Sequence, residues 1–170
     1  MDLMTALRQR RSIRRYQERP IPEETLKTLL DAAKTAPSAG NLRSRKFLVV
    51  TNPQIMKALG LAAYSQPQFS KAAALVVICA DVPRSSARYG DRGSLFAIQD
   101  ADAACMCLLL AAHALGLGAC WNGAFDDALV RDLLSLEKGV LPVAIISLGW
   151  PDQQPADPGG SQEEAVSWIT

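Results

Sequence analysis

The sequence predicts a single α+β domain in which helices pack on both faces of a β-sheet. Three short runs rich in β-branched residues, 47–51, 74–80 and 140–148, read as buried strands. The segments between them carry apolar residues at helical spacing. Because strands and helices do not alternate in a regular strand–helix–strand repeat, an α+β arrangement is favoured over a doubly wound parallel sheet.

The composition is that of one globular domain with a real core. The chain has 170 residues, of which 49% are hydrophobic and 21% are charged. The net charge of +1 argues against bulk nucleic acid or an anionic membrane as the main partner.

The cysteines and the chain start favour a soluble cytoplasmic protein. The four cysteines lack CxxC spacing and lie in apolar stretches, so free buried thiols are expected. With one histidine, a metal site lacks ligands. The N-terminus has no signal-peptide pattern. The most apolar run, residues 103–112, is shorter than the roughly twenty residues that a bilayer span needs.

In the N-terminal half, an amphipathic helix is expected over residues 2–9. Pro22 and the two acids after it open a second helix, which ends at Pro37. Residues 38–41 have turn composition. Between the first two strands, Asn52 and a following proline start a helix that reaches residue 62.

In the C-terminal half, residues 82–94 contain Pro, Ser, Gly and charges, which predicts a mobile loop or lid. Residues 95–115 form a helix about 30 Å long at 1.5 Å per residue. It is apolar almost all round, so it should be buried. A short strand or loop follows over 119–125, and Asp126 caps a helix to about residue 134. The expected domain covers residues 1–152, and residues 153–170 form an extended tail that could wrap a partner subunit.

Six arginines lie between residues 8 and 19. They are Arg8, Arg10, Arg11, Arg14, Arg15 and Arg19. On a strand, Arg10, Ser12 and Arg14 would share one face, and guanidinium groups beside a hydroxyl make a good phosphate clamp. Three interpretations stay open: a solvated surface run, a nucleic-acid or membrane patch, and a clamp for a small phosphorylated ligand.

Standard catalytic motifs are missing from the sequence. It contains no GxGxxG, GxxxxGK[ST], HEXXH or GxSxG pattern. The single histidine, His113, sits among alanines and leucines, which favours a structural role. The sequence itself therefore offers no catalytic residue of these standard types.

Four motifs in order resemble the nitroreductase family of flavoproteins. They are RRSIRRY (10–16), APSAGN (36–41), AAHALGLG leading into CWNGAF (111–125), and LGWP (148–151). The resemblance covers residues 1 to about 152. It implies a three-layer α/β/α sandwich with a mixed, mainly antiparallel sheet, and a long buried helix at the interface of a homodimer.

The resemblance also implies a cofactor, FMN, and its contacts. Arg10, Arg11, Ser12 and Arg14 would hold the phosphate and ribityl chain. The turn with Pro37, Ser38, Ala39 and Asn41 would reach the flavin of the other subunit, and Trp121, Asn122 and Gly123 would lie along the isoalloxazine ring. Hydride would pass from NAD(P)H through flavin N5 to a small organic acceptor: a nitroaromatic, a quinone or an activated alkene.

The chain departs from the family pattern in three places. Residues 155–170 contain no Lys or Arg to complete the phosphate site. The family's Gln-Pro-Trp is replaced by residues 43–45 (RSR). Arg43 could face the flavin's pyrimidine edge or be a solvated loop residue. The chain is also short, so residues 64–70 and 82–94 must form the acceptor pocket. A flavin contact by Gln66 is the less favoured interpretation of that residue. Candidate aromatic walls are Tyr64, Phe69, Tyr89 and Phe96, and core packing explains Phe69 and Phe96 equally well.

Two other functions stay open at this point. One is a flavin-binding or flavin-remodelling protein without NAD(P)H:acceptor turnover. The other is an arginine-patch nucleic-acid binder, which would be colourless and would bind DNA in a salt-sensitive way.

Overall fold

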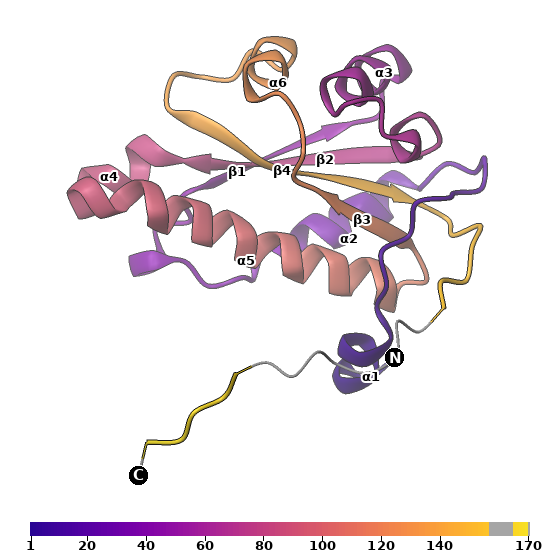
Figure 1. The fold of residues 1–170 in the computed structure, drawn as a ribbon, viewed down its shortest axis with the longest axis horizontal. Helices are drawn as coiled ribbons and strands as arrows, with labels where there is room; N and C mark the ends of the chain where they lie inside the picture. Colours follow the sequence, from indigo (N-terminus) through magenta and orange to yellow (C-terminus); the bar gives the residue numbers. More distant parts are fainter. Residues whose placement is uncertain (157–164, 170) are drawn as a thin grey trace.

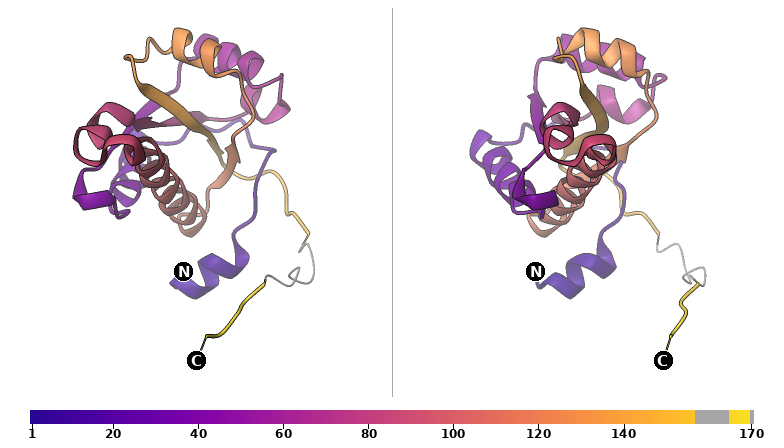
Figure 2. Two further views of the ribbon diagram at one scale, coloured as in Figure 1. Left: turned by 60° about the vertical axis from the view of Figure 1, so that its left-hand side comes forward. Right: turned by 90° about the vertical axis from the view of Figure 1, so that its left-hand side faces the viewer.

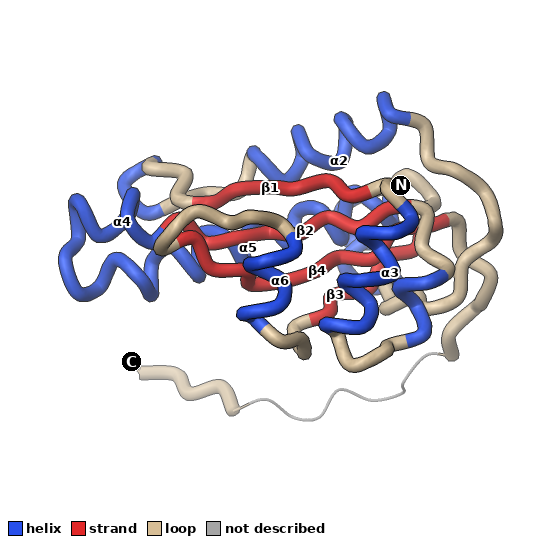
Figure 3. Tube along the Cα trace, turned by 90° about the horizontal axis from the view of Figure 1, so that it is seen from above, coloured by secondary structure: helices blue, strands red, loops and turns tan. Residues whose placement is uncertain are grey.

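A four-stranded sheet lies between two layers of helices in the computed structural model, which describes residues 1–156 and 165–169 (Figure 1). The strands are β1 (Arg45–Val50), β2 (Ala74–Asp81), β3 (Gly118–Asn122) and β4 (Val140–Gly149). They follow the order β1-β2-β4-β3, and each neighbouring pair is antiparallel (Figure 3). This arrangement confirms the expected three-layer α+β fold.

The helices divide between the two faces of the sheet (Figure 2). α2 (Glu23–Lys34) and α5 (Gly93–Ala114) cover one face, and α3 (Pro53–Ala62) and α6 (Asp127–Leu133) cover the other. α4 (Val82–Tyr89) precedes α5 and packs on it, while α1 (Leu3–Gln9) lies beside the end of α5.

The sheet contributes side chains to two hydrophobic cores, one on each face, because successive residues of a strand point to opposite faces. On β2, Val76 and Ile78 face the α2–α5 core, whereas Leu75 and Val77 face the α3–α6 core. All of β2 except its last residue is buried. Phe69 belongs to the second core.

The long helix α5 was expected, and its apolar character follows from its place in the core. Ala97, Ala101, Ala104 and Leu108 are fully buried against the sheet. Among the described residues, the stretch Val82–Ala114 is the one that is long and apolar enough to cross a membrane by length and composition. The ten-residue run considered in the sequence was therefore too narrow a test. Burial of α5 beneath the sheet explains its composition as that of a core helix.

The expectation of a loop over residues 82–94 was wrong. Those residues form α4 and a 3-10 turn before α5 begins. The Asp81 carboxylate accepts a hydrogen bond of 3.2 Å from the Arg84 amide, and Pro83 stands in the first turn. This capping signal was in the sequence, but α4 is polar and mostly exposed. It therefore lacks the apolar periodicity that indicates a helix in a sequence.

Candidate cofactor site

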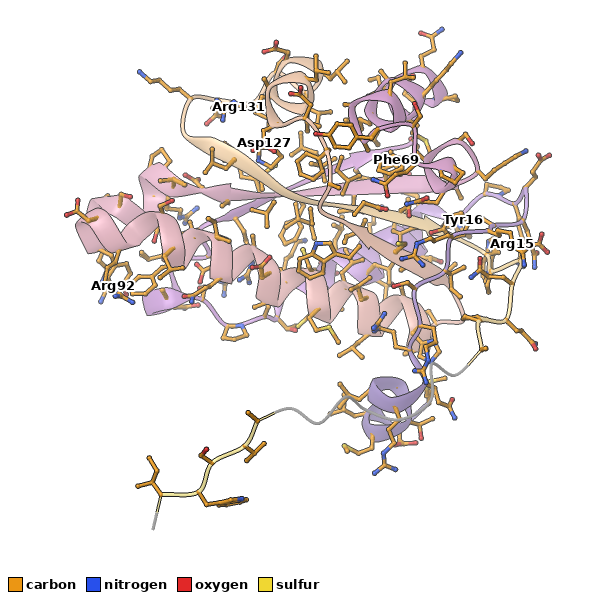
Figure 4. The ribbon with its side chains drawn as sticks, viewed as in Figure 1. Arg15, Tyr16, Phe69, Arg92, Asp127 and Arg131 are labelled. Carbon is orange, nitrogen blue, oxygen red and sulfur yellow. The ribbon has the colours of Figure 1, made fainter. Side chains whose placement is uncertain are left out.

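The arginine-rich segment after α1 is extended and is tied to the edge of the sheet. The Ile13 amide donates to the Ala119 carbonyl at 2.9 Å, and the Gln17 amide donates to the Trp150 carbonyl at 2.9 Å. A single parallel bridge pairs Ser12 with Ala119 of β3. Figure 4 shows Arg15 and Tyr16 of this segment beside the ends of β3 and β4. Residues 10–17 are called the clamp segment below.

Ser12 and Arg14 reach the Cys120 thiol. Burial raises the pKa of Cys120, and the charges of Arg14 and Arg10 together with hydrogen bonds from Ser12 and Arg14 partly offset this rise. Two of the four predicted phosphate contacts thus lie at Cys120, the residue before Trp121, and the charge of Arg10 also acts there.

Arg11 has a different set of partners from Ser12 and Arg14. Its Nη1 donates to the carbonyls of Arg8 at 2.7 Å and Arg10 at 3.0 Å, at the end of α1. It lines a separate cavity of about 480 Å³ together with His113. The guanidinium therefore helps to hold α1 as well as lying close to the clamp.

His113 has the environment of a neutral structural histidine. Burial lowers its pKa, and the nearby charges of Arg10 and Arg11 lower it further. Its Nε2 atom is buried without a hydrogen-bond partner among the described residues. Below the ordinary pKa of histidine, protonation would place a third positive charge beside two arginines.

The segment Trp121–Gly123 continues directly from the Cys120 position. Trp121 is half-buried, and Gly123 is exposed. The Asn122 side chain points into the protein, where its Nδ2 donates to the Ile145 carbonyl at 2.7 Å and to the Cys120 carbonyl at 3.0 Å. The side-chain amide is thus engaged within the protein, so what this segment offers to a ligand is its backbone.

The turn after α2 has an unusual backbone. Gly40, Asn41 and Arg43 have φ values of 55°, 56° and 53°, in the left-handed region that non-glycine residues rarely adopt. Such conformations persist only where the surroundings enforce them, and they cluster at functional sites. The exposed residues of this turn include Pro37, Asn41 and Arg43.

Two buried charged side chains enforce the shape of this turn. The Asp100 carboxylate of α5 accepts hydrogen bonds from the Ala39 amide at 2.8 Å and the Ser44 amide at 3.2 Å. Arg45 donates to the carbonyls of Lys34, Ala36 and Pro37 at 3.1, 2.7 and 3.0 Å. The Arg43 amide also donates to the Ser38 hydroxyl at 2.9 Å. The turn is therefore preformed.

The turn and the clamp segment lie at opposite ends of α5. Asp100 accepts a hydrogen bond from the turn, and the pKa of His113 is lowered by the charges of Arg10 and Arg11. The thirteen residues between them correspond to about 20 Å of helix at 1.5 Å per residue. Within one chain, the structure therefore brings Ser12 and Arg14 to Ala119 and Cys120, directly before Trp121–Gly123, and it leaves Pro37–Arg43 elsewhere.

A cavity of about 590 Å³ opens beside the clamp segment, lined by Arg14, Tyr16, Glu18, Pro67 and Lys71. Its volume is typical of a small-molecule or cofactor site. Lys71 pairs with Glu18 at 2.8 Å. Lys71 was missed in the sequence because only the tertiary fold brings residues 67–71 to the clamp.

Of the four candidate aromatic walls, one is suitably placed. Phe69 is in the core, and Tyr89 meets Phe96 edge-to-face at 5.0 Å near the turn end of α5. Tyr64 is 70% exposed. The neighbouring Gln66 donates to the Ala124 carbonyl at 3.0 Å, which places the Tyr64 loop against the segment that follows Trp121–Gly123.

The residues present fit a flavin nucleotide. Two guanidinium groups and a hydroxyl match the charge and hydrogen-bonding needs of a phosphate. The cavity at Arg14 is also lined by Pro67, and the neighbouring Gln66 donates to the Ala124 carbonyl in the exposed segment after Trp121.

Comparison with known proteins points to the same cofactor. A model of the Nitroreductase family matches residues 7–150. A Methanothermobacter thermautotrophicus protein provisionally assigned as NADH dehydrogenase/NAD(P)H nitroreductase is 36% identical, with 91% of this chain and 80% of that protein covered. The FMN reductase [NAD(P)H] of Bacillus subtilis is 27% identical, with 98% and 72% covered.

The fold comparison agrees. The crystal structure of nitroreductase A from Vibrio parahaemolyticus superimposes with a TM-score of 0.84 at 26% identity, covering 96% of this chain and 78% of that one. These relatives are named for NAD(P)H-linked reduction, which favours an enzyme over a flavin-binding protein without turnover. The chain belongs to the nitroreductase family and is an NAD(P)H-dependent flavin oxidoreductase.

Proposed function

We propose that the chain binds FMN and passes hydride from NAD(P)H to a small organic acceptor such as a nitroaromatic, a quinone or an activated alkene. The observation that carries this proposal is the approach of Ser12 and Arg14 to Cys120, directly before Trp121–Gly123, with a cavity of about 590 Å³ at Arg14. Bound FMN supplies the redox chemistry at its N5 position, and the protein supplies binding, orientation and charge.

The clamp segment holds the phosphate in this proposal. Arg10 and Arg14 offer guanidinium groups, and Ser12 offers a hydroxyl at the Cys120 thiol. Residues 155–170 contain no Lys or Arg that could add to them. Lys71 also lines the cavity, where its charge is paired with Glu18.

The acceptor side is open and carries few polar groups. Gly123 and Ala124 are exposed, and Tyr64 is the exposed aromatic side chain on the adjoining loop. An open, weakly polar site favours flat organic acceptors that are recognised by stacking. It argues against acceptors that need several fixed hydrogen bonds.

A homodimer with shared cofactor sites is part of the proposal. The preformed turn lies about 20 Å along α5 from the clamp of its own chain, so it can contribute to a site only in a second copy. Exposed apolar side chains lie on α5 and α1. They are Leu95, Met106, Leu3, Met4 and Leu7. Such unpaired apolar surface beside α5 favours burial against a second subunit.

The cofactor proposal is tested by the absorbance spectrum of purified protein with added FMN, followed by NADH without oxygen. We expect flavin bands at near-stoichiometric occupancy that bleach with NADH, and steady NADH consumption when an acceptor is added. The double variant Arg10→Ala/Arg14→Ala should lose the bands, whereas Arg84→Ala on the exposed face of α4 should keep them. Absence of bands from the wild-type protein with added FMN would refute the proposal.

Shared sites are tested by coexpressing two defective chains. Arg14→Ala damages the clamp. Gly40→Ala damages the turn, because a Cβ there would collide with the Tyr89 hydroxyl and the backbone is left-handed. Random pairing should restore tight FMN binding in about one quarter of the chains, because half of the dimers then hold one intact site. No restoration would show that the turn does not act across subunits.

The free cysteines suit a reducing compartment. All four are free thiols, and Cys79, Cys105 and Cys120 are buried. We therefore place the enzyme in the cytoplasm.

A further inference from the structure

Four buried polar side chains form a chain of hydrogen bonds between the two parts of the cofactor site. They are Tyr16, Ser147, Asn122 and Gln68, and each is at most 5% exposed. They come from the clamp segment, β4, β3 and the turn before β2, respectively. Figure 4 places Tyr16 beside the strands on the clamp side of the molecule.

At one end, Tyr16 fixes the path of the clamp segment. Its hydroxyl lies 2.6 Å from the Ile13 carbonyl and 2.9 Å from the Ser147 hydroxyl. Because a phenol carries one proton, it donates to Ile13 and accepts from Ser147. The Tyr16 ring also packs on Gly149, where a Cβ would lie 2.7 Å from the ring. Tyr16 thus holds residues 13–16 against β4 through its hydroxyl and its ring.

At the other end, Asn122 and Gln68 fix the segment 121–124. The Asn122 Nδ2 gives its two protons to the Ile145 and Cys120 carbonyls, so its contact with the Ser147 hydroxyl at 3.4 Å is a shared and weaker hydrogen bond. The Asn122 Oδ1 accepts from the Gln68 Nε2 at 2.5 Å. The Gln68 Nε2 also donates to the Gln66 Oε1 at 2.8 Å, and Gln66 donates to the Ala124 carbonyl. The chain of contacts therefore runs from Ile13 to Ala124.

Stability alone does not account for this chain. Apolar side chains would fill the same space without the cost of desolvating polar groups. Hydrogen bonds, unlike apolar contacts, specify one relative position of the groups that they join. Here the groups joined are the clamp segment and the exposed backbone after Trp121, which contact the two ends of the ligand in the proposed function.

We propose that Tyr16, Ser147, Asn122 and Gln68 are positioning residues that keep the clamp segment and residues 121–124 at the spacing that a bound flavin nucleotide requires. The identity of the ligand rests on the proposed function. The mechanical link between the two segments is a property of the free protein.

The link is tested first without a ligand, by hydrogen exchange in the variant Gln68→Met. None of the hydrogen bonds of Gln68 goes to the clamp segment, so a local effect would stay near residues 66–69 and 122–124. We expect the Ile13 and Gln17 amides to exchange about tenfold faster, because residues joined in one network are coupled. Ser85→Ala removes a buried hydroxyl without a hydrogen-bond partner in α4 and should leave both amides unchanged. Unchanged exchange in Gln68→Met would overturn the proposal.

The second test is a double-mutant cycle on FMN affinity. Tyr16→Phe and Gln68→Met should each weaken FMN binding about tenfold, and the double variant should weaken it far less than a hundredfold, because either change alone breaks the same chain. A multiplicative loss would overturn the proposal. If Gln68→Met does not fold, Asn122→Ser, whose hydrogen-bond partners likewise lie outside the clamp segment, takes its place in both tests.

The two proposals fail in distinguishable ways. Wild-type protein that binds no FMN contradicts the proposed function, while the exchange measurement still decides whether the two segments are linked. Tight FMN binding with unchanged clamp exchange in Gln68→Met contradicts the positioning role alone.

Discussion

The two ends of α5 use arginine in opposite ways. At the clamp end, Arg14 is exposed, and the backbone beneath it is held by hydrogen bonds to β3 and the end of β4. At the turn end, Arg45 is buried and its donors go to backbone carbonyls. The Arg14 side chain is open to solvent, whereas the Arg45 charge shapes a backbone. An arginine count therefore says little about binding until burial is known.

The largest effect is expected from Asp100→Ala at the turn end. The substitution leaves the Ala39 and Ser44 amides without their acceptor, and Ser44 is fully buried. The free energy of unfolding should fall by about 3 kcal/mol, because each unsatisfied buried donor costs roughly 1–3 kcal/mol. Urea unfolding measures this change.

Asp102 provides the control for Asp100. It lies two residues further along the same helix, and burial raises the pKa of its carboxylate, so its charge is held at some cost. Asp102→Ala should leave the unfolding free energy within about 0.5 kcal/mol of wild type or raise it. Equal losses in the two variants would mean that α5 tolerates no change there and that the turn is not the cause.

The next comparison sets Arg14→Gln against Arg45→Gln. Arg14→Gln should change stability by less than about 0.5 kcal/mol and weaken FMN binding roughly tenfold to a hundredfold, because a charge-assisted hydrogen bond is lost. Arg45→Gln should lower stability by about 2 kcal/mol or more. Urea unfolding and FMN fluorescence titration separate the two. A large loss of stability in Arg14→Gln would show that Arg14, like Arg45, supports the fold, and would contradict the contrast between the two ends of α5.

The smallest expected effect concerns His113 at the clamp end. Its pKa lies below 6.5 in the folded protein, so the unfolded chain binds the proton more readily. The contribution of this group to stability is therefore complete above pH 6.5 and is lost as pH falls through the folded pKa. The chain has one histidine, so its imidazole NMR signal is unique. Arg10→Gln should raise this pKa, and an unchanged value would place Arg10 away from His113.

Local signals in the sequence predicted most helices and strands. Asn52 and Asp126 cap α3 and α6 as expected, accepting hydrogen bonds from the Gln54 amide at 2.9 Å and the Leu129 amide at 3.0 Å. β1 begins at Arg45, two residues earlier than expected, because the polar residues at its start hid its beginning. Capping and periodicity act over a few residues, so they can be recognised in a single sequence.

The site was legible in part. The motif order pointed to Arg10, Ser12, Arg14 and the Trp121 segment, and the structure places Ser12 and Arg14 at Cys120, the residue before that segment; their role in binding stays a prediction. Arg45 looked like a loop substitution and is instead a buried support for the turn. The hydrogen-bonded chain from Tyr16 to Gln68 had no sequence signal, because its members are joined only by the tertiary fold. The expected tail over residues 153–170 lies partly outside the described residues.

The bond between Tyr16 and Ser147 joins residues 131 positions apart, and this has a consequence for biosynthesis. The clamp segment precedes β3 and β4 in the chain, so the strands that support it are synthesised after it. A nascent chain that stops before β4 has the arginines of the clamp segment but lacks the strand to which Tyr16 is bonded. If the clamp segment binds the flavin nucleotide as proposed, we expect a chain cut before β4 to bind it poorly.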